Sequence, residues 1–432
     1  MRLLLSLICT LALCLSHAVA RGQVLPPVSD PAGEGFSPAR LERLDAFMHT
    51  MTSAESGRDN YLGAVTLIAR NGKIVASRAY GYRDLATQSP MQTDSIFRIY
   101  SMTKTIATVA ALILMEEGKL TLEDPVSDYL PEFSSLKVFA GGTADAPTLR
   151  PPSRPLTIRH LLTHTGGFAT SGRKGDEAVK RFNRFDLHQS PTLKAYVEYV
   201  AKQPLGSDPG ERFNYDGVSL EVVSRLIEVV SGMPFDVFLQ QRILTPMAMN
   251  DTGFSVPLEK RARIADMVTT NAAGHLEIAA PHHARFPGEM LNPYPSGAGG
   301  LYSTAGDYLR FSQMLLNGGS LDGVSILGRK TVELMMMNHL THLNRPVNQF
   351  SNFEGFGLGG YVVLDVAGRG RPGSVGQFGW SGAGSTYYTI DRQEKLIALL
   401  MMQHLPQGLP KDPSKISVRF YNFVYQSLVN PP

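Results

Sequence analysis

Cysteine is almost absent from this chain. Two of its 432 residues are cysteine, and both, Cys9 and Cys14, lie within MRLLLSLICTLALCLSHAVA, residues 1–20. This segment has one arginine, an apolar stretch and the small-x-small pattern that signal peptidase cuts, so we expect a signal peptide cleaved after Ala20. An uncleaved membrane anchor is the alternative. The chain from 21 to 432 then holds no cysteine, which excludes disulfides and thiol chemistry, and we expect a periplasmic or secreted protein.

An excess of charge of one sign is lacking too. Charged residues make up 18% of the chain, hydrophobic residues 43%, and the formal net charge is +3. This balance argues against nucleic acid or an anionic membrane as a partner. No segment after the first twenty residues is long and apolar enough to span a bilayer. A small molecule is the expected partner, and the sequence does not indicate an oligomeric state.

The patterns of secondary structure change along the chain. A helix is expected from Ser37-Pro38 onward, and Asn71-Gly72 separates two β-type runs, as in a hairpin. Short helices and Pro/Gly-rich loops fill about 120–295, and β-type runs with a closing helix follow. We predict an α/β (α+β) fold in which about 37–119 and 296–432 form an antiparallel sheet flanked by helices. The region 120–295 is then an inserted, mainly helical part.

A Ser-x-x-Lys tetrad begins the longest apolar helix that the sequence predicts, from about Ser101 to Glu117. The same tetrad also occurs at 134–137 and 171–174, but without such a helix. Positions i and i+3 share one helix face, so Ser101 and Lys104 can touch. Free N–H groups at a helix start stabilise negative charge, and burial favours the neutral amine, which can take a proton from a hydroxyl. The alternative is an N-cap serine beside a lysine that reaches solvent.

Tyr215 is a candidate proton relay for such a serine–lysine pair. It lies in ERFNYDGVSLEVV, in a turn just before a predicted helix, a position that presents a side chain to a cleft. A tyrosine can pass protons where nearby positive charge favours its phenolate. By itself, one of 16 tyrosines is more often a packing residue.

Five segments in this order resemble the serine β-lactamase-like superfamily. They are FRIYSMTKTIATVAALILMEEGKLTLEDPVSDYLPEF, LTIRHLLTHTGG, PGERFNYDG, SGAGGLYSTAGDYLRFSQMLLNGG and FGWSGAGSTYYTIDR. The resemblance covers about residues 37 to 425 and is strongest to class C β-lactamases, family VIII carboxylesterases and related penicillin-binding proteins. It implies the same α/β fold and a serine hydrolase that works through an acyl-enzyme without a metal or organic cofactor.

The resemblance also assigns roles to single residues. Ser101 corresponds to the acyl-accepting nucleophile, Lys104 to the group that handles its proton, and Tyr215 to the general base and acid. The third motif of the family, which contacts substrate, corresponds to Trp380-Ser381-Gly382. The backbone N–H groups of Ser101 and Ala383 would form the oxyanion hole.

Two departures from the β-lactamase pattern bear on the substrate. Trp380 stands where those enzymes have the lysine that holds the substrate carboxylate, and Gly217 stands where they have an asparagine that contacts the acyl amide. Both changes favour small to medium esters, so we predict a carboxylesterase. The alternatives are a β-lactamase, a D-amino-acid peptidase or an acyl transferase with the same machinery. A catalytically silent protein that binds cell-wall peptide is the rival from another class.

Two further patterns are typical of other enzymes, a zinc-binding histidine pair and the nucleophile elbow of an α/β-hydrolase. His160 and His164 have the i, i+4 spacing of a zinc pair on an expected helix. A metalloprotease needs glutamate directly after the first histidine, but Leu161 is there, so we expect no metal. The segment Gly379–Ala383 lacks the last glycine of a Gly-x-Ser-x-Gly elbow, which argues against an α/β-hydrolase.

Overall fold

The computed structural model describes residues 25–53, 60–172, 175–280, 287–343 and 349–430. The predicted signal peptide lies outside these ranges. Within them, no helix combines the length and the apolar character needed to cross a membrane.

One seven-stranded antiparallel sheet organises the molecule. The order is β11-β12-β13-β14-β15-β1-β2, so the N-terminal hairpin pairs with the last strand of the chain through β1 and β15. Asn71 and Gly72 both have positive φ, 52° and 76°, as a two-residue hairpin turn requires. The strands are β1 Gly63–Arg70, β2 Lys73–Gly81, β11 Glu354–Phe356, β12 Tyr361–Val363, β13 Phe378–Gly382, β14 Thr386–Asp391 and β15 Leu396–Met402. The predicted sheet is confirmed.

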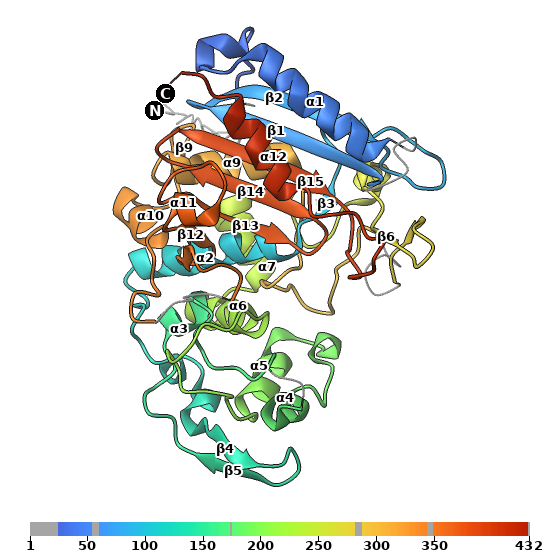
Figure 1. Ribbon diagram of the computed structural model, residues 1–432. Helices are drawn as coiled ribbons and strands as arrows, with labels where there is room; N and C mark the ends of the chain where they lie inside the picture. The colour runs from blue at the N-terminus through green and yellow to red at the C-terminus, as the bar shows by residue number, and fades with distance from the viewer. Residues whose placement is uncertain (1–24, 54–59, 173–174, 281–286, 344–348, 431–432) are drawn as a thin grey trace, which may run out of the picture.

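Helices cover both faces of this sheet (Figure 1). The terminal helices α1 (Pro38–Thr52) and α12 (Ser417–Gln426) pack together on one face, and α2 (Thr103–Glu116) and α9 (Ala305–Leu316) lie on the other. Strand β1 is buried on both sides, so its side chains alternate between the two cores: Ala64 and Ile68 join the terminal helices, while Val65 and Leu67 join α2.

The segment between about 120 and 295 is mainly helical, as expected. Residues 138–201 lie at the lower end of the molecule in Figure 1, whereas the strand at 268–270 lies beside the large sheet. The core of this segment is continuous with that under the sheet, because Ile106 of α2 and Leu226 of α6 belong to one buried cluster. The division into two domains therefore stays a prediction. The segment contains α3 Ile158–Leu162, α4 Glu177–Phe182, α5 Leu193–Ala201, α6 Val218–Ser231 and α7 Phe235–Leu239, and the hairpins β4 Val138–Gly142 with β5 Pro147–Arg150 and β6 Val268–Thr270 with β7 Leu276–Ile278.

Short elements complete the chain and connect the two parts. They are β3 Phe97–Arg98, β8 Tyr302–Ser303, β9 Ser320–Leu321, β10 Val324–Ser325, α10 Arg329–Met335 and α11 Val366–Arg369. Strands β3 and β8 pair directly ahead of α2. This pairing fixes the chain just before the Ser-x-x-Lys tetrad.

Helix α2 carries that tetrad to the boundary between the sheet and the helical part. Its residues from Thr103 to Leu114 are all buried, which explains the long apolar run in the sequence. The α-helix starts two residues later than predicted, because a 3-10 turn over Tyr100–Met102 precedes it. Gly118, with φ of 68°, follows its end.

Candidate active site

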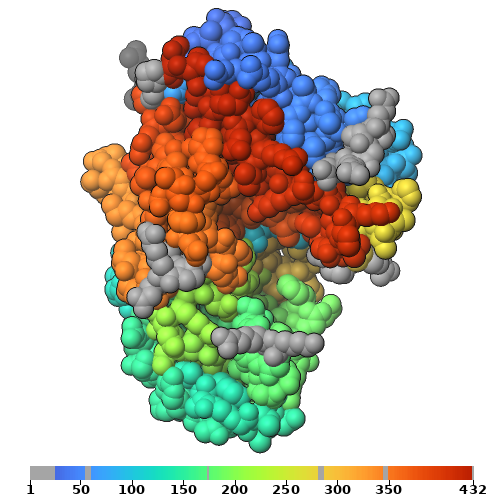
Figure 2. All heavy atoms as spheres, viewed as in Figure 1, coloured from blue at the N-terminus to red at the C-terminus, as the bar shows by residue number. Residues whose placement is uncertain are grey.

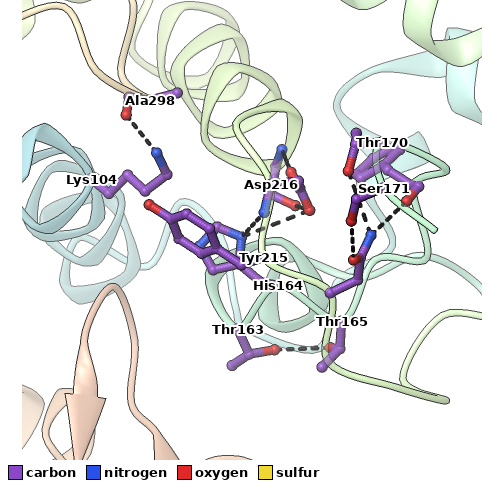
Figure 3. A network of polar contacts seen from close by, with 12 residues as sticks. Lys104, Thr163, His164, Thr165, Thr170, Ser171, Tyr215, Asp216 and Ala298 are labelled. Atoms are coloured by element: carbon purple, nitrogen blue, oxygen red, sulfur yellow. Dashed lines mark hydrogen bonds and ion pairs between the residues drawn. The ribbon is translucent and has the colours of Figure 1, made fainter. Parts of the chain in front are cut away.

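Ser101 and Lys104 are in direct contact. The Lys104 Nζ lies 3.1 Å from Ser101 Oγ. It also donates a hydrogen bond of 2.5 Å to the Ala298 carbonyl, which Figure 3 shows. Lys104 is 3% exposed. The Ala298 carbonyl thus holds the Lys104 Nζ within reach of Ser101 Oγ, where a proton can pass between the two side chains. The predicted contact between the two residues is thus present.

The turn that holds Ser101 is strained. Tyr100, directly before it, has φ of 41°, a conformation that is unfavourable for a large side chain. The Tyr100 ring is buried in a small cluster with Met267, Ala279 and Leu405, and this packing holds the backbone in place. Ser101 is therefore presented from a tight 3-10 turn at the start of α2.

Tyr215 reaches the same place from the loop before α6. Its hydroxyl accepts a hydrogen bond of 3.0 Å from Trp380 Nε1, and its ring centroid lies 5.1 Å from Lys104 Nζ. Within the described ranges its hydroxyl bonds to Trp380 and to neither Ser101 nor Lys104. The structure thus brings together Ser101, Lys104, Tyr215 and Trp380 from three separate segments. The hydrogen bonds through which Tyr215 would pass a proton to Ser101 or Lys104 are not made in this arrangement.

The Tyr215 ring packs against the ring of a buried histidine, His164. His164 lies 4.6 Å from it, centroid to centroid, and His164 Nδ1 accepts from the Asp216 N–H at 3.4 Å. Burial lowers the pKa of His164, with Asp216 opposing the shift, so a neutral imidazole supports the tyrosine.

The expectation that both histidines share one helix was wrong. Helix α3 ends at Leu162, and His164 has φ of 52°, outside any helix. His160 instead accepts from the Thr157 N–H at 3.1 Å in a capping box at the helix start. Over the ranges that the structure describes, no group of three His, Cys, Asp or Glu side chains could hold a metal ion.

Glu221 of α6 fixes the carbonyl that holds Lys104. Its carboxylate accepts from the Ser296 hydroxyl and, at 3.1 Å, from the Gly297 N–H, next to Ala298. The side chain is buried, and burial raises the pKa of Glu221 to about 7. Sequence reasoning missed Glu221; its signal is a carboxylate between Leu220 and Val222 in a helix segment that is buried all round.

The third motif occupies β13, next to the Ser101 turn. A Cβ on Gly382 would lie 2.3 Å from the Ile99 carbonyl oxygen and 2.4 Å from Thr386 Oγ1, so the close approach needs glycine. Ser381, Gly382 and Ala383 line the same pocket as Ser101. The oxyanion hole formed by the N–H groups of Ser101 and Ala383 stays a prediction.

We expect Gly382→Ala to lower kcat/KM for esters about tenfold, because the added methyl group pushes β13 away from the nucleophile turn by a fraction of an ångström. Gly306→Ala is the matched control, since its added methyl group would meet no atom closer than 3.9 Å. Steady-state kinetics with an ester substrate give kcat/KM of both variants for comparison with wild type. Equal activity of the Gly382 variant and wild type would contradict the close approach.

A pocket of about 320 Å³ opens over these residues. Ser101, Tyr215 and Trp380 line it, and Figure 2 shows the surface hollowed between the orange and red C-terminal segments and the green helical part. Phe350, whose ring centroid is 5.8 Å from that of Trp380, also lines the pocket, and the buried Phe356 packs against Trp380 at 5.1 Å. A volume of this size suits a small organic substrate.

A family model described as Beta-lactamase matches residues 44–417. The chain belongs to the beta-lactamase family. Esterase EstB of Burkholderia gladioli is 29% identical over 413 residues, which are 90% of this chain and 97% of that protein. An uncharacterized protein of Mycobacterium tuberculosis is 34% identical over 80% of this chain and 86% of its own. The solved structure of EstCE1, described as a hydrolase with promiscuous acyltransferase activity, has a TM-score of 0.73 at 25% identity, over 90% of this chain and 98% of its own.

These relatives confirm the resemblance and the fold that the sequence predicted. This member of the beta-lactamase family is a hydrolase, and its relatives include an esterase. The similarity extends over nearly all described residues, so the site lies within the shared fold and not in an added segment.

Proposed function

We propose that this protein is an exported carboxylesterase that hydrolyses small to medium esters through an acyl-enzyme on Ser101. The observation that carries the proposal is the 3.1 Å contact between Lys104 Nζ and Ser101 Oγ in a pocket walled by Trp380. Export rests on the predicted signal peptide, and a mature N-terminus at Arg21 is its test.

In the proposed reaction, Ser101 Oγ attacks the ester carbonyl carbon while its proton passes to the neutral Lys104 amine. The N–H groups of Ser101 and Ala383 stabilise the oxyanion. As the C–O bond breaks, Tyr215 gives a proton to the leaving alkoxide and regains one from Lys104. Water then attacks the acyl-enzyme by the same route in reverse, which releases the acid and restores the serine proton.

The walls of the pocket favour esters over β-lactams. Trp380 supplies apolar surface and a single N–H donor, which bonds to Tyr215, where β-lactamases place a cation. Gly217 has no side-chain amide with which to contact the acyl group of the substrate. Transfer to an alcohol would use the same acyl-enzyme, and the description of the EstCE1 structure favours this as a second activity.

A fluorophosphonate should label Ser101, since its Oγ would form a bond to phosphorus as fluoride leaves. Peptide mass spectrometry locates the label.

We also expect p-nitrophenyl butyrate to be hydrolysed with a kcat/KM about a hundredfold above that for a chromogenic cephalosporin, because the carboxylate of the latter finds no cation beside Ser101. Label on another serine would mean a different nucleophile. Absence of both label and turnover would identify a silent binding protein.

A further inference from the structure

The pocket continues past Trp380 to an end lined by charged residues. Arg371, in the loop after α11, and Lys415, directly before α12, line it there, together with Glu354 of β11. The same cavity therefore has Ser101 at one part of its wall and two cations at another. The aromatic side chains of Trp380 and Tyr387 line the same cavity.

Positive charge exceeds negative charge at this end. Glu354 accepts from Arg369 Nε at 2.6 Å and from Arg371 Nη2 at 2.9 Å, so one carboxylate serves two guanidinium groups. Lys415 has no carboxylate within ion-pair distance in the described part of the chain; its Nζ lies 5.5 Å from the centroid of the Tyr387 ring. In the described residues, Glu354 therefore pairs with Arg369 and Arg371, and Lys415 is left without an ion-pair partner.

The two arginines differ in what they can offer a ligand. Arg369 is held by the fold, since its guanidinium lies 5.2 Å from the Tyr361 ring and also bonds to Gln377 at 3.1 Å. Arg371 lines the pocket and Arg369 does not, although Arg371 Nε and Arg369 Nη2 are both buried without a hydrogen-bond partner in the described residues. A buried donor without a partner is unfavourable and is usually explained by a missing acceptor.

Lys415 is also poorly compensated. Its residue surface is exposed, yet desolvation around the amine, followed by the positive charge of Arg371, lowers the pKa of Lys415, and Glu354 only partly opposes the shift. An anion between Lys415 and Arg371 would relieve both effects. A carboxylate suits this place, because guanidinium and ammonium groups form their strongest hydrogen bonds to ionised oxygens.

We propose that Arg371 and Lys415 bind a carboxylate of the substrate, so that this pocket takes esters with a carboxylate several atoms from the scissile bond. The inference rests on the proposed esterase function and narrows its substrate class. The carboxylate can belong to the acyl chain, as in a monoester of a dicarboxylic acid, or to the alcohol. The cations lie at the far end of the cavity, past Trp380, whose position they do not replace.

Two matched substrate pairs test the acyl and the alcohol side. Mono-p-nitrophenyl adipate and p-nitrophenyl hexanoate share an acyl chain of equal length and differ by a terminal carboxylate. The butyrate ester of 4-hydroxybutyrate and butyl butyrate differ in the same way on the alcohol side. The measured quantity is the ratio of kcat/KM for the charged over the neutral ester. In at least one pair, wild type should favour the charged ester about tenfold or more.

Lys415→Gln and Arg371→Gln should each lower that ratio about tenfold, while Lys415→Arg keeps it. Arg419→Gln removes the same charge from an exposed position on α12 that does not line the pocket, and should leave the ratio as in wild type. The pair that shows the dependence on Lys415 identifies which side of the ester carries the carboxylate. Ratios near one in both pairs, unchanged by the variants, would overturn the proposal.

Binding without turnover gives a second readout. Trp380 is the only tryptophan of the chain and lines this pocket, so its fluorescence should respond to ligands in a Ser101→Ala background. Monomethyl adipate should bind there, and Lys415→Gln should raise its Kd about tenfold. Lys415-dependent binding of this ligand, combined with no ester turnover by wild type, would refute the proposed function alone. Turnover of neutral esters without such binding would refute the carboxylate site alone.

Discussion

Ser101→Ala should hydrolyse p-nitrophenyl butyrate about ten-thousandfold more slowly than wild type, and Lys104→Met should reach nearly the same residual rate. The Lys104 amine is the proton acceptor in contact with Ser101 Oγ, at 3.1 Å, so the serine without it keeps its proton and attacks poorly. Because the two residues act as one unit, the double variant should lose no more than either single one. Steady-state kinetics of the three proteins decide this.

The chain provides its own matched control for this experiment. Ser134 and Lys137 repeat the tetrad on the surface, so Ser134→Ala and Lys137→Met should keep wild-type rates. Losses in the double variant that multiply those of the single ones would mean that Ser101 and Lys104 act independently.

Lys104→Met should also unfold at the same temperature or a higher one, since a buried amine is replaced by an apolar chain of similar length.

The parts of this site that the sequence predicts are those fixed by local structure. Ser101 and Lys104 are one helical turn apart, so an apolar helix is enough to place them together. The hairpin at Asn71-Gly72 follows from two residues that tolerate positive φ. Tyr215 was a candidate from its turn before a helix, but its role and the place of Trp380 came from the family resemblance, because 165 residues separate the two and no local rule links them.

Contacts between distant segments were missed for the same reason. Lys104 bonds to Ala298, 194 residues away, and the cations at the far end of the pocket come from segments with no shared pattern. The missing cation was predicted from the sequence only at the position of Trp380. His164 was misplaced because i, i+4 spacing predicts a shared face only while the helix continues, and α3 ends after Leu162.

Glu221→Ala should lower both stability and activity. It removes the acceptor for the Ser296 hydroxyl and the Gly297 N–H, two buried donors, and we expect a loss of about 3 kcal/mol in the free energy of unfolding. The Ala298 carbonyl follows directly after Gly297, so kcat/KM should fall about a hundredfold as Lys104 loses its place. Glu221→Gln is the matched variant: its oxygen can accept from Gly297 while its amide donates to Ser296.

The pH dependence of stability distinguishes the carboxyl from its amide replacement. Burial raises the pKa of Glu221 from 4.5 to about 7, so between these values the folded state binds more protons than the unfolded state. The stability of wild type relative to Glu221→Gln is therefore highest below pH 4.5 and falls as the pH rises to 7, by about 3 kcal/mol. Urea unfolding followed by Trp380 fluorescence at several pH values measures it. Parallel curves for the two proteins would show that the Glu221 carboxyl is no harder to ionise in the fold than in the unfolded chain. In that case Glu221→Ala should still lose the Ala298 carbonyl contact, because that loss depends on the two hydrogen bonds and not on the charge.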